Sequence, residues 1–237
     1  MNGKLNIFSV IGFVVTAAFA VVQKWSLPEF SWSSWLAGLV YSWACVVTAS
    51  LQILYKAQAE RTQYEARLPF LRHLSPTQFL LGLSGLIVLI GFAAFRIYGF
   101  LFSFYGLFLS VFAEMEPVSL FGRDGFINSD FLTPVVYLLY LFWPMALGVV
   151  IANWQDLFRK EPWKRILLPF QKEILRIHLM VLALPFVALA AWALFGEAYQ
   201  SITIVFLLAL FYLIPGRKEK EASHHDAGWT SGTTPQP

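Results

Sequence analysis

Cysteine and charged side chains are both scarce in this sequence of 237 residues. A single cysteine, Cys45, excludes a disulfide within the chain, and its place in an apolar segment favours a small packing residue. Only 13% of the residues are charged whereas 58% are hydrophobic, and the mean hydropathy is +0.63. Apolar blocks of this length are too long for a soluble core, so the composition indicates a polytopic helical membrane protein.

Signatures of catalysis, metal binding and nucleic-acid recognition are also missing. No nucleophile stands beside a base at a recognisable spacing, and no phosphate-binding loop occurs. His224 and His225 lack further ligands nearby, so we expect no metal site. The middles of the apolar segments contain no Asp or Glu, which argues against proton-coupled transport.

Six apolar segments predict transmembrane helices, at 5–22, 34–55, 77–96, 131–152, 174–195 and 199–214. This count places fourteen of the 17 basic residues on one side, which is the cytoplasm by the positive-inside rule. The prediction is an all-α fold of six spans over residues 1–215, in a bacterial inner membrane with both termini cytoplasmic. Residues 216–237 are polar and proline-ended, which predicts a disordered cytoplasmic tail.

The first segment also resembles a signal peptide, because Lys4 precedes an apolar stretch that ends in the small-residue pattern Ala18-Phe19-Ala20. The length of the stretch and the single preceding lysine favour a retained anchor. Cleavage, which would leave five spans, is the alternative.

Arg96 is the one basic residue inside a long apolar run, at the end of the third predicted span. The span from residue 77 to Arg96 measures about 29 Å as a helix, which is one hydrocarbon thickness. We therefore predict that Arg96 is an interfacial anchor. A buried functional arginine paired with Glu114 or Glu116 is the alternative.

The apolar run continues after Arg96 through residues 97–112, so the third helix is either unusually long and tilted or kinked near Gly99. Small residues recur there at helical spacing and form a stripe on one face: Gly99, Ser103, Gly106 and Ser110. Such a stripe lets another helix approach closely. It packs within the chain or, alternatively, contacts another subunit, a lipid or an apolar cofactor.

Polar residues near the cytoplasmic ends of several spans form the candidate ligand site. They share a predicted depth and comprise Gln52, Asn153, Asp156, Glu173, Arg176 and His178. His178 is the only histidine in a predicted span. The alternative interpretation is a set of solvated helix ends with local hydrogen bonds.

Several segments together resemble a family of bacterial membrane proteins classed as a domain of unknown function: 41–56 (YSWACVVTASLQILYK), 95–108 (FRIYGFLFSFYGLF), Asn153 and 169–178 (PFQKEILRIH). The resemblance implies a six-span fold and no activity. Asn153 and His178 match the family. Two features of the family are absent. Ala44 and Cys45 stand where the family has a Glu-Asn pair, and Ile97 and Tyr105 stand where it has two histidines.

These observations favour a protein without enzymatic machinery. The first hypothesis is an accessory or structural subunit that packs with partner helices, lipid, or an apolar cofactor such as a pigment or quinone. The second is a small-solute transporter that uses the polar residues on the cytoplasmic side. The third is a membrane-embedded enzyme on an apolar substrate, with His178 facing a pocket.

Overall fold

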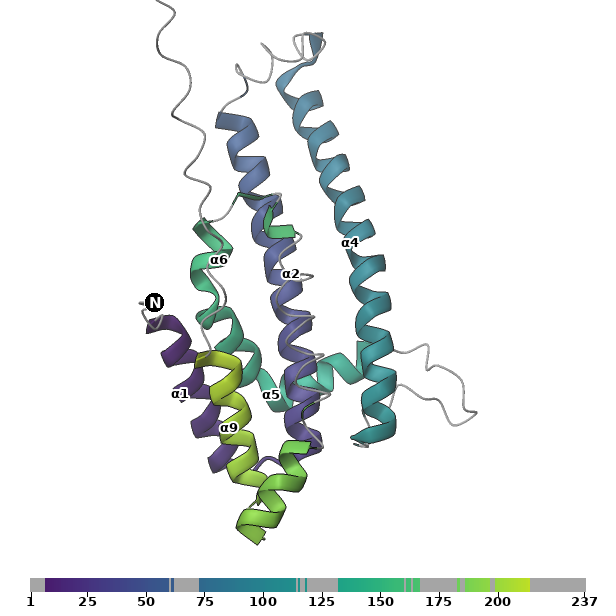
Figure 1. Ribbon diagram of the computed structural model, residues 1–237. Coiled ribbons are helices and arrows are strands. Elements are labelled where there is room, and N and C mark those ends of the chain that lie inside the picture. Colours follow the sequence, from purple (N-terminus) through teal and green to yellow (C-terminus); the bar gives the residue numbers. More distant parts are fainter. Residues whose placement is uncertain are drawn as a thin grey trace, which may run out of the picture.

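The computed structural model describes residues 7–59, 61, 73–113, 115, 118, 132–159, 161–162, 164–166, 183, 186–196 and 199–213. Its labelled elements are α1 (Ile7–Val22), α2 (Leu27–Ala59), α4 (Pro76–Phe112), α5 (Leu132–Ala152), α6 (Trp154–Arg159) and α9 (Tyr199–Leu213). A further apolar helix covers Phe186–Phe195. Within these ranges every element is helical, which confirms the all-α prediction (Figure 1).

Three of the described helices are long and apolar enough to cross a membrane, namely Leu27–Ala57, Pro76–Val111 and Leu132–Ala152. The other apolar helices of the described chain are shorter: Ile7–Val22, Phe186–Phe195 and Tyr199–Leu213. These six helices correspond in order to the six predicted spans. The structure thus establishes three candidate spans by length and composition.

The second span begins earlier than the sequence predicted, at Leu27 instead of residue 34. Ser26 and Glu29 explain the difference because they form a reciprocal cap. The Ser26 backbone N–H donates to a Glu29 carboxylate oxygen at 2.7 Å, and the Glu29 backbone N–H donates to Ser26 Oγ at 3.4 Å. The cap satisfies backbone groups ahead of the apolar run and lengthens α2 to 33 residues.

The third span is the unusually long helix α4, which continues through Gly99 for 37 residues. At 1.5 Å per residue its length is about 55 Å, well beyond one hydrocarbon thickness. Ser75 and Gln78 form a capping box at its start, and Pro76 occupies the first turn. Of the two expectations, the structure therefore shows the long helix.

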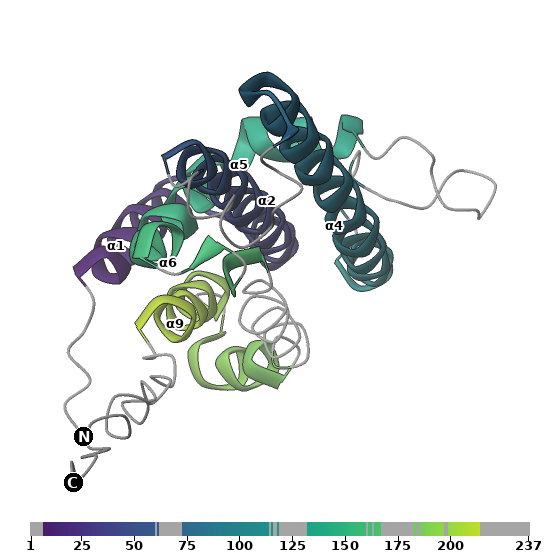
Figure 2. The same ribbon diagram turned by 90° about the horizontal axis from the view of Figure 1, so that it is seen from above.

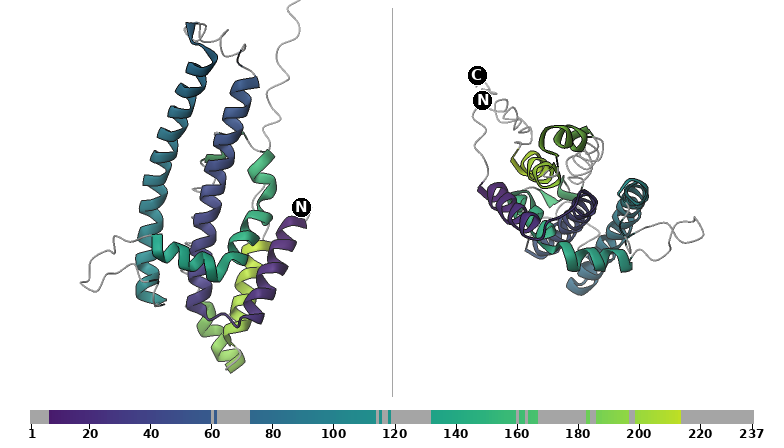
Figure 3. Two further views of the ribbon diagram at one scale, coloured as in Figure 1. Left: turned by 180° about the vertical axis from the view of Figure 1, so that it is seen from behind. Right: turned by 90° about the horizontal axis from the view of Figure 1, so that it is seen from below.

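Helix α5 contains a kink that sets the shape of the fold. Phe142 has non-helical backbone angles (φ −117°, ψ 25°), and Pro144 lies two residues later. Proline causes this bend because it has no N–H and its ring collides with the preceding turn. The first half of α5 consequently runs across the direction of α2 and α4, whereas the second half turns toward α6 (Figure 3).

Helices α1, α5 and α9 pack tightly at a pair of glycines. A Cβ atom built on Gly12 would lie 2.6 Å from the Gly148 carbonyl oxygen, so only glycine permits this approach. Beside it, the Thr16 and Tyr212 hydroxyls lie 3.2 Å apart in a hydrogen bond. This hydrogen bond joins α1 to α9 directly, beside Gly148 in the second half of α5.

Tryptophan side chains attach α4 to α2. Trp32 Nε1 donates to the Ala113 carbonyl and Trp35 Nε1 donates to the Phe102 carbonyl, both at 2.8 Å. Both indole rings are fully buried. The second half of α4 is therefore held to α2, while α4 as a whole stands at the edge of the bundle (Figure 2).

Candidate functional site

A buried arginine lies beside the C-terminal half of α2. Arg165 is 1% exposed, and its Nη2 donates a hydrogen bond to Gln52 Oε1. Tyr41 and Cys45 of α2 lie near it. A guanidinium buried in a membrane protein is normally held by such polar partners, so Gln52 and Arg165 form a genuine polar pair inside the bundle.

Helix α4 also holds this segment in place. The Tyr98 hydroxyl, on a side chain that is 2% exposed, donates a hydrogen bond to the Ile166 carbonyl. Residues 164–166 are therefore bound by α2 through Gln52 and by α4 through Tyr98. The arrangement fixes Arg165 between the two longest helices.

Arg165 was not predicted to be buried, because it lies among several basic residues between the fourth and fifth predicted spans, a pattern typical of a cytoplasmic loop. A signal was present: Arg165 is followed by the apolar residues Ile166, Leu167 and Leu168. Lys164, by contrast, is exposed and pairs with Glu161 at 3.2 Å. These two adjacent cations differ in burial because Arg165, not Lys164, contacts Gln52 of α2.

The rest of the predicted polar cluster is only partly described. Asn153 Nδ2 donates to the Val149 carbonyl of its own helix at 2.9 Å, and the Asn153 carbonyl accepts from the Asp156 N–H at 2.9 Å. These are local bonds at the junction of α5 and α6. Glu173, Arg176 and His178 lie outside the described residues, so convergence of the six residues stays a prediction.

A groove of about 630 Å³ opens between α2, α4 and the first half of α5. Arg96 and Ser103 are the polar side chains in its lining. The apolar lining includes Leu39, Trp43, Phe95, Phe100, Val135 and Leu139. A volume of this size falls in the range of small-molecule sites, which are typically apolar with few polar groups.

The predicted small-residue stripe divides between this groove and the protein interior. Gly99 and Ser103 line the groove, and a Cβ atom built on Gly99 would meet nothing within 4 Å. Gly106 is buried, and its carbonyl accepts a hydrogen bond from Ser110 Oγ at 2.8 Å. The stripe therefore has one packed end and one open end.

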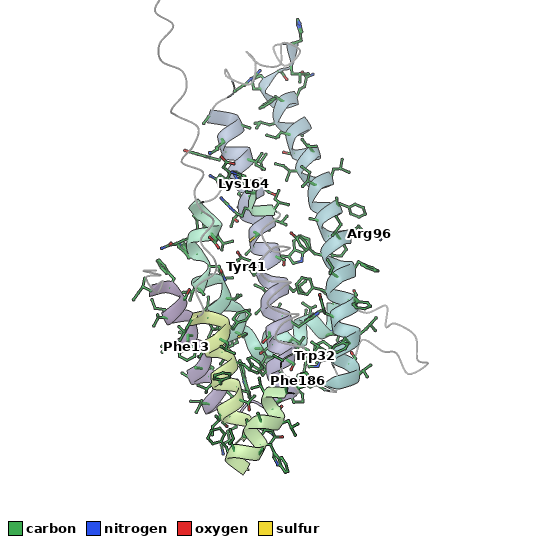
Figure 4. All side chains as sticks on the ribbon, in the orientation of Figure 1. Phe13, Trp32, Tyr41, Arg96, Lys164 and Phe186 are labelled. Carbon is green, nitrogen blue, oxygen red and sulfur yellow. The ribbon has the colours of Figure 1, made fainter. Side chains whose placement is uncertain are left out.

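Arg96 lies halfway along α4, as Figure 4 shows, and its side chain is exposed at the edge of the groove. No ion pair or hydrogen bond involves Arg96 among the residues that the structure describes. The helix continues beyond it, and Phe102 and Leu109 there are buried against the core. Its role as an interfacial anchor stays a prediction.

Metal binding has no support in the described ranges, where no group of three or more His, Cys, Asp or Glu side chains could hold an ion. Comparison with protein-family models, curated proteins and solved structures finds no match.

Proposed function

We propose that this chain is a non-catalytic accessory subunit of the bacterial inner membrane, which packs with a partner helix along α4. The observation that carries this proposal is the contrast between α4 and its neighbours. Only 6% of the most apolar window of α4 is buried, compared with 56% in α2 and 44% in α5. Among the three candidate spans of the described chain, the longest helix is therefore the one that the other residues cover least.

Glycines in the first half of α4 support close contact with another helix. Cβ atoms built on Gly82, Gly85 and Gly91 would each meet nothing within 4 Å. Glycine weakens an isolated helix relative to alanine, yet it lets two membrane helices approach until their backbones touch. This part of α4 extends past the ends of α1, α6 and α9 (Figure 1).

The proposal includes six spans with both termini in the cytoplasm. The three shorter apolar helices would complete the set, and the basic segments that follow the second and fourth spans would face the cytoplasm. Green fluorescent protein and alkaline phosphatase fused separately to the C-terminus test this topology. Fluorescence without phosphatase activity is expected, and the reverse pattern would contradict the proposal.

The partner is tested by purification from the native membrane into nanodiscs, followed by mass spectrometry of every co-purifying protein. We expect a stoichiometric partner with the unaltered chain and its loss with Gly85→Leu, since the added side chain blocks close approach. Ala18→Leu on the exposed side of α1 is the matched control and should retain the partner. Recovery of the chain alone, or of the same partner with Gly85→Leu, would refute the proposal.

The hydrogen-bonded pair of Gln52 and the buried Arg165 favours the second candidate function, a small-solute transporter. It ranks lower because neither Gln52 nor Asn153 lines either of the two cavities described in the structure. A water-filled path would let a membrane-impermeant thiol reagent reach Cys45, which is fully buried. We expect no labelling of the folded protein, and rapid labelling would favour transport.

The third candidate, an enzyme on an apolar substrate, depends on His178 and therefore lies outside the described residues. Unchanged activity of His178→Ala on a candidate substrate would count against it.

A further inference from the structure

The first half of α5 forms one wall of the groove between α2 and α4. Leu132, Val135 and Leu139 recur at helical spacing on this half of α5, and all three line the groove. Because this half of α5 runs across the direction of α2 and α4, it limits how far a straight helix parallel to α4 could extend along the groove (Figure 3). A flexible hydrocarbon chain can turn within the same space.

The open edge of the groove carries a positive charge. Arg96 is exposed there, and it has no anionic partner within the described part of the chain. Cations at membrane depth are normally paired, and the planar guanidinium group suits the oxygens of a phosphate, to which it donates two parallel hydrogen bonds. The site therefore combines an apolar interior with a donor for an anionic group.

Open space beside Gly99 extends the groove from Arg96 toward Ser103. A Cβ atom on Gly99 would meet no other atom within 4 Å, so the backbone of α4 itself forms part of the wall. A quinone or a neutral pigment would fill the apolar interior but would leave the Arg96 guanidinium without an anion. A phospholipid with an anionic head satisfies both parts of the site.

We infer that the groove binds one anionic phospholipid, with its phosphate on Arg96 and an acyl chain along Gly99 toward the crosswise half of α5. The inference concerns a stretch of α4 further along the helix than the glycines of the proposed partner contact, and it requires no partner protein. Lipid retention by the isolated chain therefore tests it separately from the proposed function.

The experiment uses nanodiscs that contain phosphatidylcholine and phosphatidylglycerol in equal amounts, followed by native mass spectrometry of the released protein. We expect the unaltered chain to retain phosphatidylglycerol in preference to phosphatidylcholine. Arg96→Gln should lower retention of phosphatidylglycerol about tenfold, the size expected for the loss of one charge-assisted hydrogen bond to its phosphate. The preference over phosphatidylcholine should fall as well, because the choline cation of that lipid offsets its phosphate and only phosphatidylglycerol has a net negative charge for Arg96 to attract. Arg96→Lys, which keeps the charge, should retain most of that preference.

Two further variants complete the design. Gly99→Leu fills the groove and should reduce retention of both lipids, and the open space at Gly99 allows the chain to keep its fold. Lys56→Gln removes an exposed cation of α2 outside the groove and should leave retention unchanged. Equal retention of both lipids by the unaltered chain, or an equal loss with Lys56→Gln and Arg96→Gln, would overturn the inference.

Discussion

Replacement of Gly12 by alanine should destabilise the protein, because this glycine lies where α1 crosses α5. The added Cβ atom would come within 2.6 Å of the Gly148 carbonyl oxygen, about 0.8 Å closer than the 3.4 Å at which ordinary contact begins. It would also lie 3.1 Å from Ala152 Cβ and 3.2 Å from Tyr212 Cε1. The first of these neighbours is backbone and cannot rotate away, so α1 must shift.

The size of the effect follows from two opposing contributions. Overpacking of this kind costs about 1–3 kcal/mol, and the greater helix propensity of alanine returns up to about 1 kcal/mol. We expect a net loss of about 1–2 kcal/mol in the free energy of unfolding, and a melting temperature lower by about 5 °C. Gly82→Ala is the matched control because its Cβ atom would meet nothing within 4 Å, so its stability should be unchanged or higher.

The single cysteine supplies the assay. Cys45 is fully buried, so a thiol-reactive dye that fluoresces on coupling reports the opening of the core as temperature rises. If Gly12→Ala melts at the same temperature as Gly82→Ala, then α1 does not cross α5 at Gly12 and Gly148. The alternative that the first span is cleaved as a signal peptide predicts that equality, so the experiment also tests retention of α1.

The same assay tests two hydrogen bonds. Trp35→Phe should lower the free energy of unfolding by about 1 kcal/mol, because the buried Phe102 carbonyl loses the indole N–H that donates to it. Trp43→Phe is the control and should have a smaller effect, since no hydrogen bond of the Trp43 indole occurs in the described chain. Equal effects would show that the Trp35 bond contributes nothing. Gln52→Leu should lower the free energy of unfolding by about 1–3 kcal/mol, because Arg165 loses a hydrogen-bond acceptor inside the bundle. Gln52→Glu should leave the free energy of unfolding unchanged, because its carboxylate supplies charged acceptor oxygens. The same loss with both Gln52 variants would contradict the assigned pairing.

The continuous apolar segments predicted where the described helices lie, because a long apolar helix satisfies its backbone hydrogen bonds internally and leaves a strong signal in the sequence. Hydropathy predicts the ends of helices less well than their positions. The second span begins at Leu27 because Ser26 and Glu29 cap it, and a count of apolar residues does not register a cap. The long third helix was one of two predicted forms, since nothing in residues 97–112 distinguished a bend from a continuous helix.

Burial of a cation was considered at Arg96, as the alternative to an interfacial anchor, and was not predicted for Arg165. Arg96 attracted attention because its neighbours along the chain are apolar, but burial depends on which helix packs against a residue. Arg96 is exposed on α4, whereas Arg165 is enclosed through its contact with Gln52. Sequence shows the local environment of each arginine, and the partner that buries one of them lies 113 positions away.

The groove illustrates the same dependence on distant residues. Helical spacing correctly placed Gly99 and Ser103 on one face, yet it could not show what lies opposite that face. The answer depends on Pro144, because the kink in α5 directs Leu132, Val135 and Leu139 across the space between α2 and α4. A straight α5 would remove this wall of the groove and leave Gly99 open to a parallel helix. The shape that selects a flexible chain at Arg96 is therefore set by a proline in another helix.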